Sequence, residues 1–188
     1  MIVHNNNSIF SLKKMTLASM FASITIVMSF ISIPLPFSPV PITGQTFALM
    51  LSGSLLDPIT SFFSMIIYLS LGAIGIPVFA GFHGGISALL GPTGGYLIAM
   101  PIASFVISLL ARIGNINFFK LILANIIGGI LIVYALGVLQ LSVVAGLEIK
   151  KAVLLGAVPY ILGDFIKVLI SSYLSLKLRP VLKKYTDI

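Results

Sequence analysis

The chain has 188 residues and a net charge of +7, yet only 8% of its residues are charged and 59% are hydrophobic. A soluble domain carries about 25% charged residues, so this composition excludes an ordinary soluble protein. The positive residues are not interleaved with aromatic residues on a polar face, which argues against nucleic acid as a partner. We expect an all-α polytopic membrane protein that folds as a single domain over residues 1–188, with the lipid bilayer as its surroundings.

Six apolar segments predict six transmembrane helices in one bundle. Their long, continuous apolar runs differ from the alternating strands of a membrane barrel. The first is longer than the core of a signal peptide, so we expect it to be retained. The second is short for a span, which needs about 20 residues, and we expect it to be re-entrant or to begin inside a binding site. The segments cover about 13–33, 43–56, 58–74, 93–112, 118–141 and 151–178.

Two of the connections between these segments have unusual compositions. Residues 34–41 hold four of the ten prolines, which favours an extended, polyproline-like backbone. Residues 72–95 hold eight of the seventeen glycines but remain apolar. Non-helical backbone at membrane depth is tolerated where it is buried or lines a cavity. We therefore expect the second connection to fold onto the bundle.

The distribution of lysine and arginine predicts that both termini lie in the cytoplasm. With six spans and an inner N-terminus, eight basic residues fall on the inner side and two, Lys150 and Lys151, on the outer side. This asymmetry follows the positive-inside rule, and it places both unusual connections outside. The eight inner residues are Lys13, Lys14, Arg112, Lys120, Lys177, Arg179, Lys183 and Lys184.

The sixth segment contains the most informative polar residues. Tyr160, Asp164, Lys167 and Ser171 follow a helical spacing that places them in one stripe. Asp164 and Lys167, three residues apart, can pair. Ionisable residues inside a membrane are costly and usually mark a binding site or a pathway. The stripe suits a small polar or zwitterionic ligand, and the alternative is a structural ion pair that fixes helix packing.

Further polar or small residues are candidates for the same site. Asn125 can bind a ligand or form an interhelical hydrogen bond. Gly94, Gly95 and Tyr96 open the fourth segment, where backbone N–H groups can approach a ligand, although a tight turn explains them equally well. At the start of the second segment, Thr43, Gln45 and Thr46 can cap a helix or face a ligand, and Thr43 as the cap is favoured.

Several kinds of chemistry find no support in the sequence. There is no cysteine, so disulfides and thiolate chemistry are excluded. His4 and His83 have too few carboxylates near them to form a metal site. No serine–histidine–aspartate set is present, so we expect a protein that is not an enzyme and has no metal. Ala18 and Ala22 form a small-xxx-small pair in the first segment, which on its own favours internal helix packing.

Three strings of residues resemble the BioY family, the biotin-binding S components of energy-coupling factor (ECF) transporters. They are Pro39–Phe47 (PVPITGQTF), Gly75–Gly81 (GIPVFAG) and Gly91–Tyr96 (GPTGGY). The late pair of Asp164 and Lys167 is similar too, and the resemblance covers about residues 13–180. Phe82 and His83 depart from a loop that is often richer in glycine in the family.

The resemblance implies a membrane subunit that captures biotin from the outer face of the cell membrane. It implies a coupling transmembrane subunit and two cytoplasmic ATPases as partners, biotin as transported ligand, and no cofactor. It also implies that Ala18 and Ala22 contact the coupling subunit. An S component for another vitamin, or a small-solute channel, is the alternative.

The chemistry of biotin is compatible with these candidate residues. Asp164 can accept a hydrogen bond from a ureido N–H, and Asn125 or Tyr160 can complete that end. Lys167 can neutralise the ligand carboxylate or orient Asp164, and the sequence leaves both roles open. Phe79 and other apolar residues can cover the ring and chain.

Overall fold

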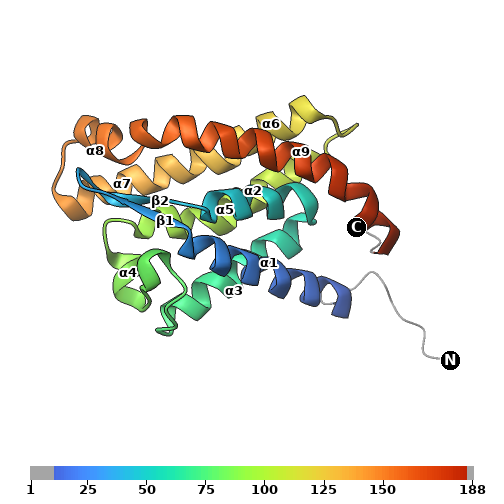
Figure 1. Cartoon of the computed structure of the whole chain (residues 1–188), viewed down its shortest axis with the longest axis horizontal. Helices are drawn as coiled ribbons and strands as arrows, with labels where there is room; N and C mark the ends of the chain where they lie inside the picture. Colours follow the sequence, from blue (N-terminus) through green and yellow to red (C-terminus); the bar gives the residue numbers. More distant parts are fainter. Residues whose placement is uncertain (1–10, 186–188) are drawn as a thin grey trace.

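The structure is a computed structural model that describes the backbone of residues 11–185 and the side chains of residues 11–182. Most of the chain forms one elongated helical bundle (Figure 1). The helices are α1 (Leu12–Phe30), α2 (Gln45–Leu55), α3 (Pro58–Ala73), α4 (Ile86–Leu90), α5 (Gly94–Arg112), α6 (Phe118–Asn125), α7 (Val133–Ala145), α8 (Ile149–Gly156) and α9 (Ile161–Tyr185). Three further helical turns are η1 (Ala80–Phe82), η2 (Ile126–Ile132) and η3 (Val158–Tyr160).

The six predicted apolar segments correspond to α1, α2, α3, α5, the run α6–η2–α7 and the run α8–η3–α9. Within the described residues, three helical runs are long and apolar enough to cross a membrane: Gly94–Arg112, Phe118–Ala145 and Ile149–Leu182. The predicted class, a helical membrane protein, is confirmed. Helix α2 is only 11 residues long, and nearly all of its side chains are buried. Its neighbours α1, α5 and α9 enclose it, which explains how a segment too short to span the bilayer can be so apolar.

The proline-rich connection forms a β-hairpin. Strands β1 (Ser32–Leu35) and β2 (Ser38–Thr43) are antiparallel, and Ser32 pairs with Thr43. The predicted extended backbone is therefore present, but as a hairpin and not as a free polyproline segment. A sheet of two strands has an edge on each strand, where prolines can lie without removing a hydrogen bond. The pairing is irregular between Ile33 and Leu35, at Pro34.

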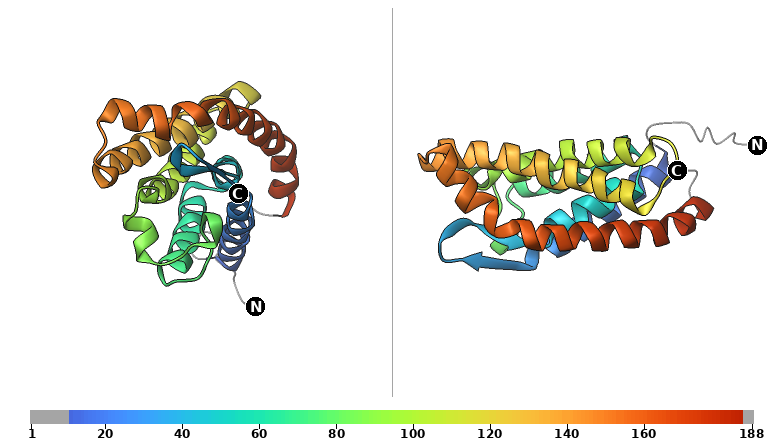
Figure 2. Two further views of the ribbon diagram at one scale, coloured as in Figure 1. Left: turned by 60° about the vertical axis from the view of Figure 1, so that its left-hand side comes forward. Right: turned by 90° about the horizontal axis from the view of Figure 1, so that it is seen from above.

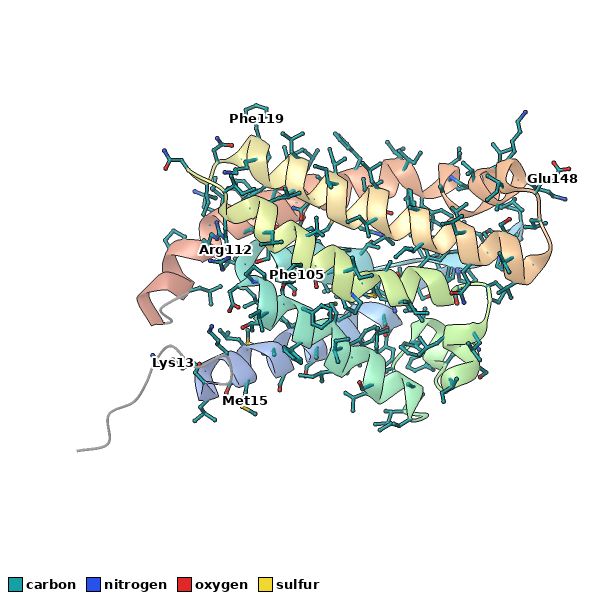
Figure 3. The ribbon with its side chains drawn as sticks, turned by 180° about the vertical axis from the view of Figure 1, so that it is seen from behind. Lys13, Met15, Phe105, Arg112, Phe119 and Glu148 are labelled. Carbon is teal, nitrogen blue, oxygen red and sulfur yellow. The ribbon has the colours of Figure 1, made fainter. Side chains whose placement is uncertain are left out.

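The bundle has two chemically different ends. We call the end that carries the tip of the β-hairpin, α4 and α8 the hairpin end (Figures 1 and 2). The other carries the start of α1, the end of α5 and the end of α9, and we call it the basic end. Lys13 and Arg112 lie at the basic end, and Glu148 lies at the opposite extreme of the molecule (Figure 3).

The sixth segment is interrupted at Pro159, and the interruption shapes the hairpin end. Proline has no N–H to continue the helix, so backbone carbonyls of the preceding turn need other donors. The carbonyl of Leu155 accepts a hydrogen bond from Ser38 Oγ at 3.0 Å, and that of Gly156 accepts one from the Tyr96 hydroxyl at 2.8 Å. The break thereby fixes both the hairpin and α5 against α8.

Candidate ligand-binding site

A cavity of about 710 Å³ lies at the hairpin end. This volume is in the range of about 300–1,000 Å³ that is typical of small-molecule sites. Its walls come from the β-hairpin, the 79–93 connection, and helices α2, α5 and α9, together with the η2–α7 junction. Of the residues proposed from the sequence, Thr43, Gln45, Phe79, Tyr96, Tyr160, Asp164 and Lys167 line it.

Asp164 and Lys167 form an ion pair on the first turns of α9. Lys167 Nζ lies 2.7 Å from Asp164 Oδ1, and only 4% of Asp164 is exposed. Lys167 Nζ also donates to the Thr43 carbonyl at 2.7 Å and to Thr46 Oγ1 at 3.0 Å. An ammonium group has three donors, and all three are used. The lysine therefore holds the carboxylate and the start of α2 in fixed positions.

Tyr134 of α7 completes this polar centre. Its hydroxyl donates to Asp164 Oδ2 at 2.6 Å, and Thr46 Oγ1 lies 3.1 Å from Asp164 Oδ1. Both carboxylate oxygens are thus already hydrogen-bonded, and each oxygen of a carboxylate has about two acceptor positions. The centre is electrically balanced and preformed, with acceptor capacity left on Oδ2.

Tyr160 connects the start of α9 to the hairpin. Its hydroxyl donates to the Val40 carbonyl and lies 2.9 Å from Ser38 Oγ. Tyr160 is only 6% exposed and packs with Val40. Tyr160 therefore helps to hold the hairpin at the cavity, together with the hydrogen bonds from Ser38 to the Leu155 carbonyl and from Lys167 to the Thr43 carbonyl.

The start of α2 is arranged differently from the favoured prediction. Gly44 occupies the N-cap position of α2, so the expectation that Thr43 caps this helix is wrong. Glycine is used because a side chain there would meet the Met28 carbonyl, only 2.7 Å from the added carbon. Thr43 Oγ1 instead donates to Gln45 Oε1 at 3.0 Å, and Gln45 Nε2 donates to the Tyr68 hydroxyl.

Aromatic side chains form part of the apolar cavity wall, beside aliphatic residues such as Leu97 and Met100. Phe79 is 3% exposed and meets the Tyr68 ring edge-on, with ring centroids 5.5 Å apart. Phe82 stacks on Phe30 with a centroid separation of 4.6 Å, which joins the 79–93 connection to the end of α1. Phe82 adopts a left-handed backbone with φ of 59°, an uncommon conformation for a residue with a side chain.

Four residues proposed from the sequence do not line the cavity. One is Ser171 of the polar stripe, which is buried and accepts a hydrogen bond from Asn125. Asn125 is fully buried between helices, where it accepts from Ser54 at 3.1 Å and donates to Ser172 at 3.0 Å. It therefore has the interhelical role, the alternative weighed against ligand binding. Gly94 and Gly95 face α7 and the end of α4: a carbon added to Gly95 would lie 2.3 Å from the Leu136 carbonyl. These glycines allow close packing at the start of α5.

The small-residue pair of α1 is also buried. Ala18 is 3% exposed and Ala22 is 1% exposed, and Ala22 packs with Leu49 and Met65 in the core. The structure thus does not present the two alanines as an open face for a partner. Ala18 does line a groove of about 160 Å³ between α1 and α3, beside the exposed Ser19.

The model of the BioY family matches residues 4–184 of the chain. This chain belongs to the BioY family. It is 42% identical over 155 residues to the probable biotin transporter BioY of Pyrococcus horikoshii, covering 82% of this chain and 89% of that protein. It is 39% identical over 170 residues to the biotin transporter BioY of Thermotoga maritima, covering 90% and 98%.

Comparison with a solved structure agrees with this family assignment. The S component for biotin from an ECF-type ABC transporter superposes with a TM-score of 0.86 at 28% identity, covering 96% of this chain and 95% of that one. The expected resemblance to the BioY family is confirmed. A BioY-family protein is a multi-pass membrane transport protein, so the expectation of a transport function and not an enzymatic one is confirmed as well.

The sequence reasoning missed one residue at the centre of the site of this BioY-family chain. Tyr134 was not proposed, although it contacts Asp164 directly. The available signal was a single hydroxyl-bearing side chain in the otherwise apolar run 126–139. Thr46 was noticed only as part of the start of the second segment. Within the described residues no group of three histidines or carboxylates comes together, and His4 lies outside them.

Proposed function

We propose that this chain is the biotin-binding S component of an ECF-type importer and that it captures biotin in the cavity at the hairpin end. The observation that carries the proposal is the polar centre of Asp164, Lys167, Tyr134 and Thr46, which lines the 710 Å³ cavity and has the buried Asp164 at its middle. The names of the relatives supply the ligand: the Thermotoga maritima protein is a biotin transporter, and the superposed structure is an S component for biotin.

Biotin fits the chemistry of this centre. Its ureido group has two N–H donors and a strong acceptor, and an apolar ring and chain connect that group to a carboxylate. Asp164 accepts one ureido N–H through Oδ2. The hydroxyls of Tyr134 and Tyr160 already donate to Asp164 and to the Val40 carbonyl, so their oxygens are left to accept the second ureido N–H. Phe79 and Met100 cover the ring. Lys167 orients Asp164, since its three donors are already used.

Isothermal titration of the purified chain tests the proposal. Biotin is expected to bind saturably, and thiamine and riboflavin, which have different polar groups, are expected not to bind. Binding of either of those vitamins in preference to biotin would replace the proposed ligand. Conductance of reconstituted liposomes without saturable binding would favour a channel.

The orientation proposed from the positive-inside rule places the hairpin end outside and both termini in the cytoplasm. Because the chain has no cysteine, a thiol reagent labels only the single cysteine that is introduced, and the labelling shows on which side of the membrane that end lies. Glu148→Cys at the hairpin end is expected to react with a membrane-impermeant maleimide on intact cells. Asn115→Cys in the exposed loop at the basic end is expected to react only after the membrane is opened. The reverse labelling pattern would contradict this orientation.

We further propose that the β-hairpin is the outer cover of the site. Tyr160→Phe removes the hydroxyl that holds Val40 and Ser38, and one such hydrogen bond contributes about 1 kcal/mol. Biotin is therefore expected to dissociate about fivefold faster, while the melting temperature changes little. Tyr173→Phe is the matched control, because it changes an exposed tyrosine of α9 that lies further from the hairpin. An unchanged dissociation rate in Tyr160→Phe would show that the hairpin does not retain the ligand.

The proposed partners are a coupling transmembrane subunit and two cytoplasmic ATPases. The groove between α1 and α3 supports a contact site for the coupling subunit near the basic end. Its lining is mostly apolar and contains small residues that let a helix approach closely. It consists of Lys14, Met15, Ala18, Ser19, Ile59, Thr60, Phe63 and Ile67. Ala18 then contributes the floor of the groove, and Ser19 its open edge.

A further inference from the structure

The basic end gathers charged side chains from four segments of the chain. Lys14 of α1 lies 3.9 Å from Asp57, which precedes α3. Arg112, the last residue of α5, is close enough to interact electrostatically with Asp57 and with Arg179 of α9. Lys14 and Arg112 thus share a single carboxylate, and Arg179 lies close to Arg112.

Asp57 cannot balance these charges alone. Its carboxylate caps α3, accepting from the Thr60 N–H at 3.2 Å and from Thr60 Oγ1 at 2.6 Å. It also pairs with Lys14. Neither arginine forms an ion pair with a carboxylate among the residues that the structure describes.

Arg179 is the decisive member of this cluster. Only 8% of it is exposed, and its Nη1 has no hydrogen-bond partner within the described part of the chain. Ser175 Oγ, one turn earlier on the same face of α9, is buried and unpartnered too. Leaving a buried charge unpaired costs several kcal/mol. Planar guanidinium groups are well suited to phosphate, which they bind through two parallel hydrogen bonds.

The depth of the cluster corresponds to the head groups of a bilayer. The apolar spans Gly94–Arg112 and Ile149–Leu182 both end at this level. Around Arg179, the outward side chains of α9 are mostly apolar and one is basic: Leu178 is 41% exposed, Val181 is 54% exposed, and Lys177 is exposed as well. An anion that approaches Arg179 from this side therefore meets apolar surroundings. The acyl chains of a phospholipid suit such surroundings, and an acidic protein segment does not.

We propose that Arg179 and Arg112 form a site for the phosphate of an anionic phospholipid at the basic end of the bundle. Basic pockets between helices at the membrane surface have the charge and depth to hold such head groups. The site is separate from the cavity at the hairpin end and does not depend on biotin being the ligand there.

Native mass spectrometry of the delipidated chain with added phosphatidylglycerol or phosphatidylcholine tests the proposal. The wild-type chain is expected to prefer phosphatidylglycerol. Arg179→Gln is expected to bind it at least about tenfold more weakly, since a hydrogen bond to a charged group contributes about 1.5–3 kcal/mol. Lys177→Gln, which neutralises an exposed cation on the same turn of α9, is the matched control and is expected to retain the preference.

A melting experiment gives a second readout, because a ligand that binds only the folded state raises its stability. Phosphatidylglycerol is expected to raise the melting temperature of the wild type and of Lys177→Gln, but not of Arg179→Gln. If Arg179→Gln does not fold, Arg112→Gln decides, and it is expected to lose the preference as well. The biotin affinity of each variant shows whether the cavity at the hairpin end is intact.

Three results would overturn the proposal. The first is equal binding of the two lipids by the wild type, and the second is unchanged phosphatidylglycerol binding in the arginine variants. The third is binding of glycerol phosphate as tightly as the lipid, which would assign the site to free phosphate. The second result can have a specific cause. If Arg179→Gln binds phosphatidylglycerol normally but no longer co-purifies with the coupling subunit, Arg179 contacts that protein and not a lipid.

Discussion

Asp164→Asn is expected to weaken biotin binding by about thirtyfold to several thousandfold, because truncating or neutralising a charged partner in a buried site costs about 2–5 kcal/mol. Asp164 accepts from Lys167, Thr46 and Tyr134. An asparagine has one acceptor oxygen and would turn its NH₂ group toward one of these donors. It would also leave the partly buried Lys167 ammonium without a counter-charge.

Lys167→Ala is expected to give a loss of similar size by a different route. It removes the group that holds the Thr43 carbonyl and Asp164 together, so the carboxylate loses its fixed position and its partner charge. Lys151→Ala, an exposed lysine at the same end of the bundle, is the matched control. Titration calorimetry gives the affinities, and a melting curve shows that each variant is folded. Wild-type affinity in both variants would return the pair to a structural role.

The second large effect concerns α1, where two neighbouring substitutions are expected to behave differently. Ala22→Trp inserts a large ring into the core beside Leu49 and Met65, and overpacking of this kind costs about 1–3 kcal/mol or more. Its stability and biotin affinity are expected to fall together. Ser19→Trp places the ring at the open edge of the α1–α3 groove, so it is expected to abolish uptake and leave biotin affinity unchanged.

Two measurements on the same preparations separate these outcomes: biotin affinity of the isolated chain, and recovery of the coupling subunit by co-purification. For Ser19→Trp we expect normal affinity and no coupling subunit. Ser23→Trp, one turn further along the exposed face of α1 and outside the groove, is the control that retains the subunit. A Ser19→Trp complex that survives with normal uptake would exclude the groove as the contact site.

Much of this arrangement was accessible from the sequence because a membrane imposes simple rules. Long apolar runs mark the helices, and an aspartate and a lysine three residues apart inside such a run face the same cavity. The helical spacing places Tyr160, Asp164, Lys167 and Ser171 in one stripe. The first three line the cavity, although Tyr160 precedes α9, whereas Ser171 is buried lower in the bundle.

The remaining features depend on contacts between distant segments. No local pattern shows that Tyr134 of α7 meets Asp164, or that Asn125 lies among the serines of α2 and α9. The prolines of residues 34–41 indicate extended backbone, but the pairing of β1 with β2 depends on both flanking helices. For Ala22, the spacing defines a helical face, and only the packing of α3 and α2 decides that this face is internal.

The central claim is that the cavity at the hairpin end holds biotin, and mass spectrometry of the small molecules released from purified protein tests it most directly. The chain is expressed in cells supplied with a mixture of vitamins, purified in mild detergent and denatured to release its ligand. We expect biotin in near one-to-one amounts from the wild type and Lys151→Ala, and far less from Asp164→Asn. A different vitamin released in that ratio, or equal biotin from Asp164→Asn and the wild type, would contradict the account.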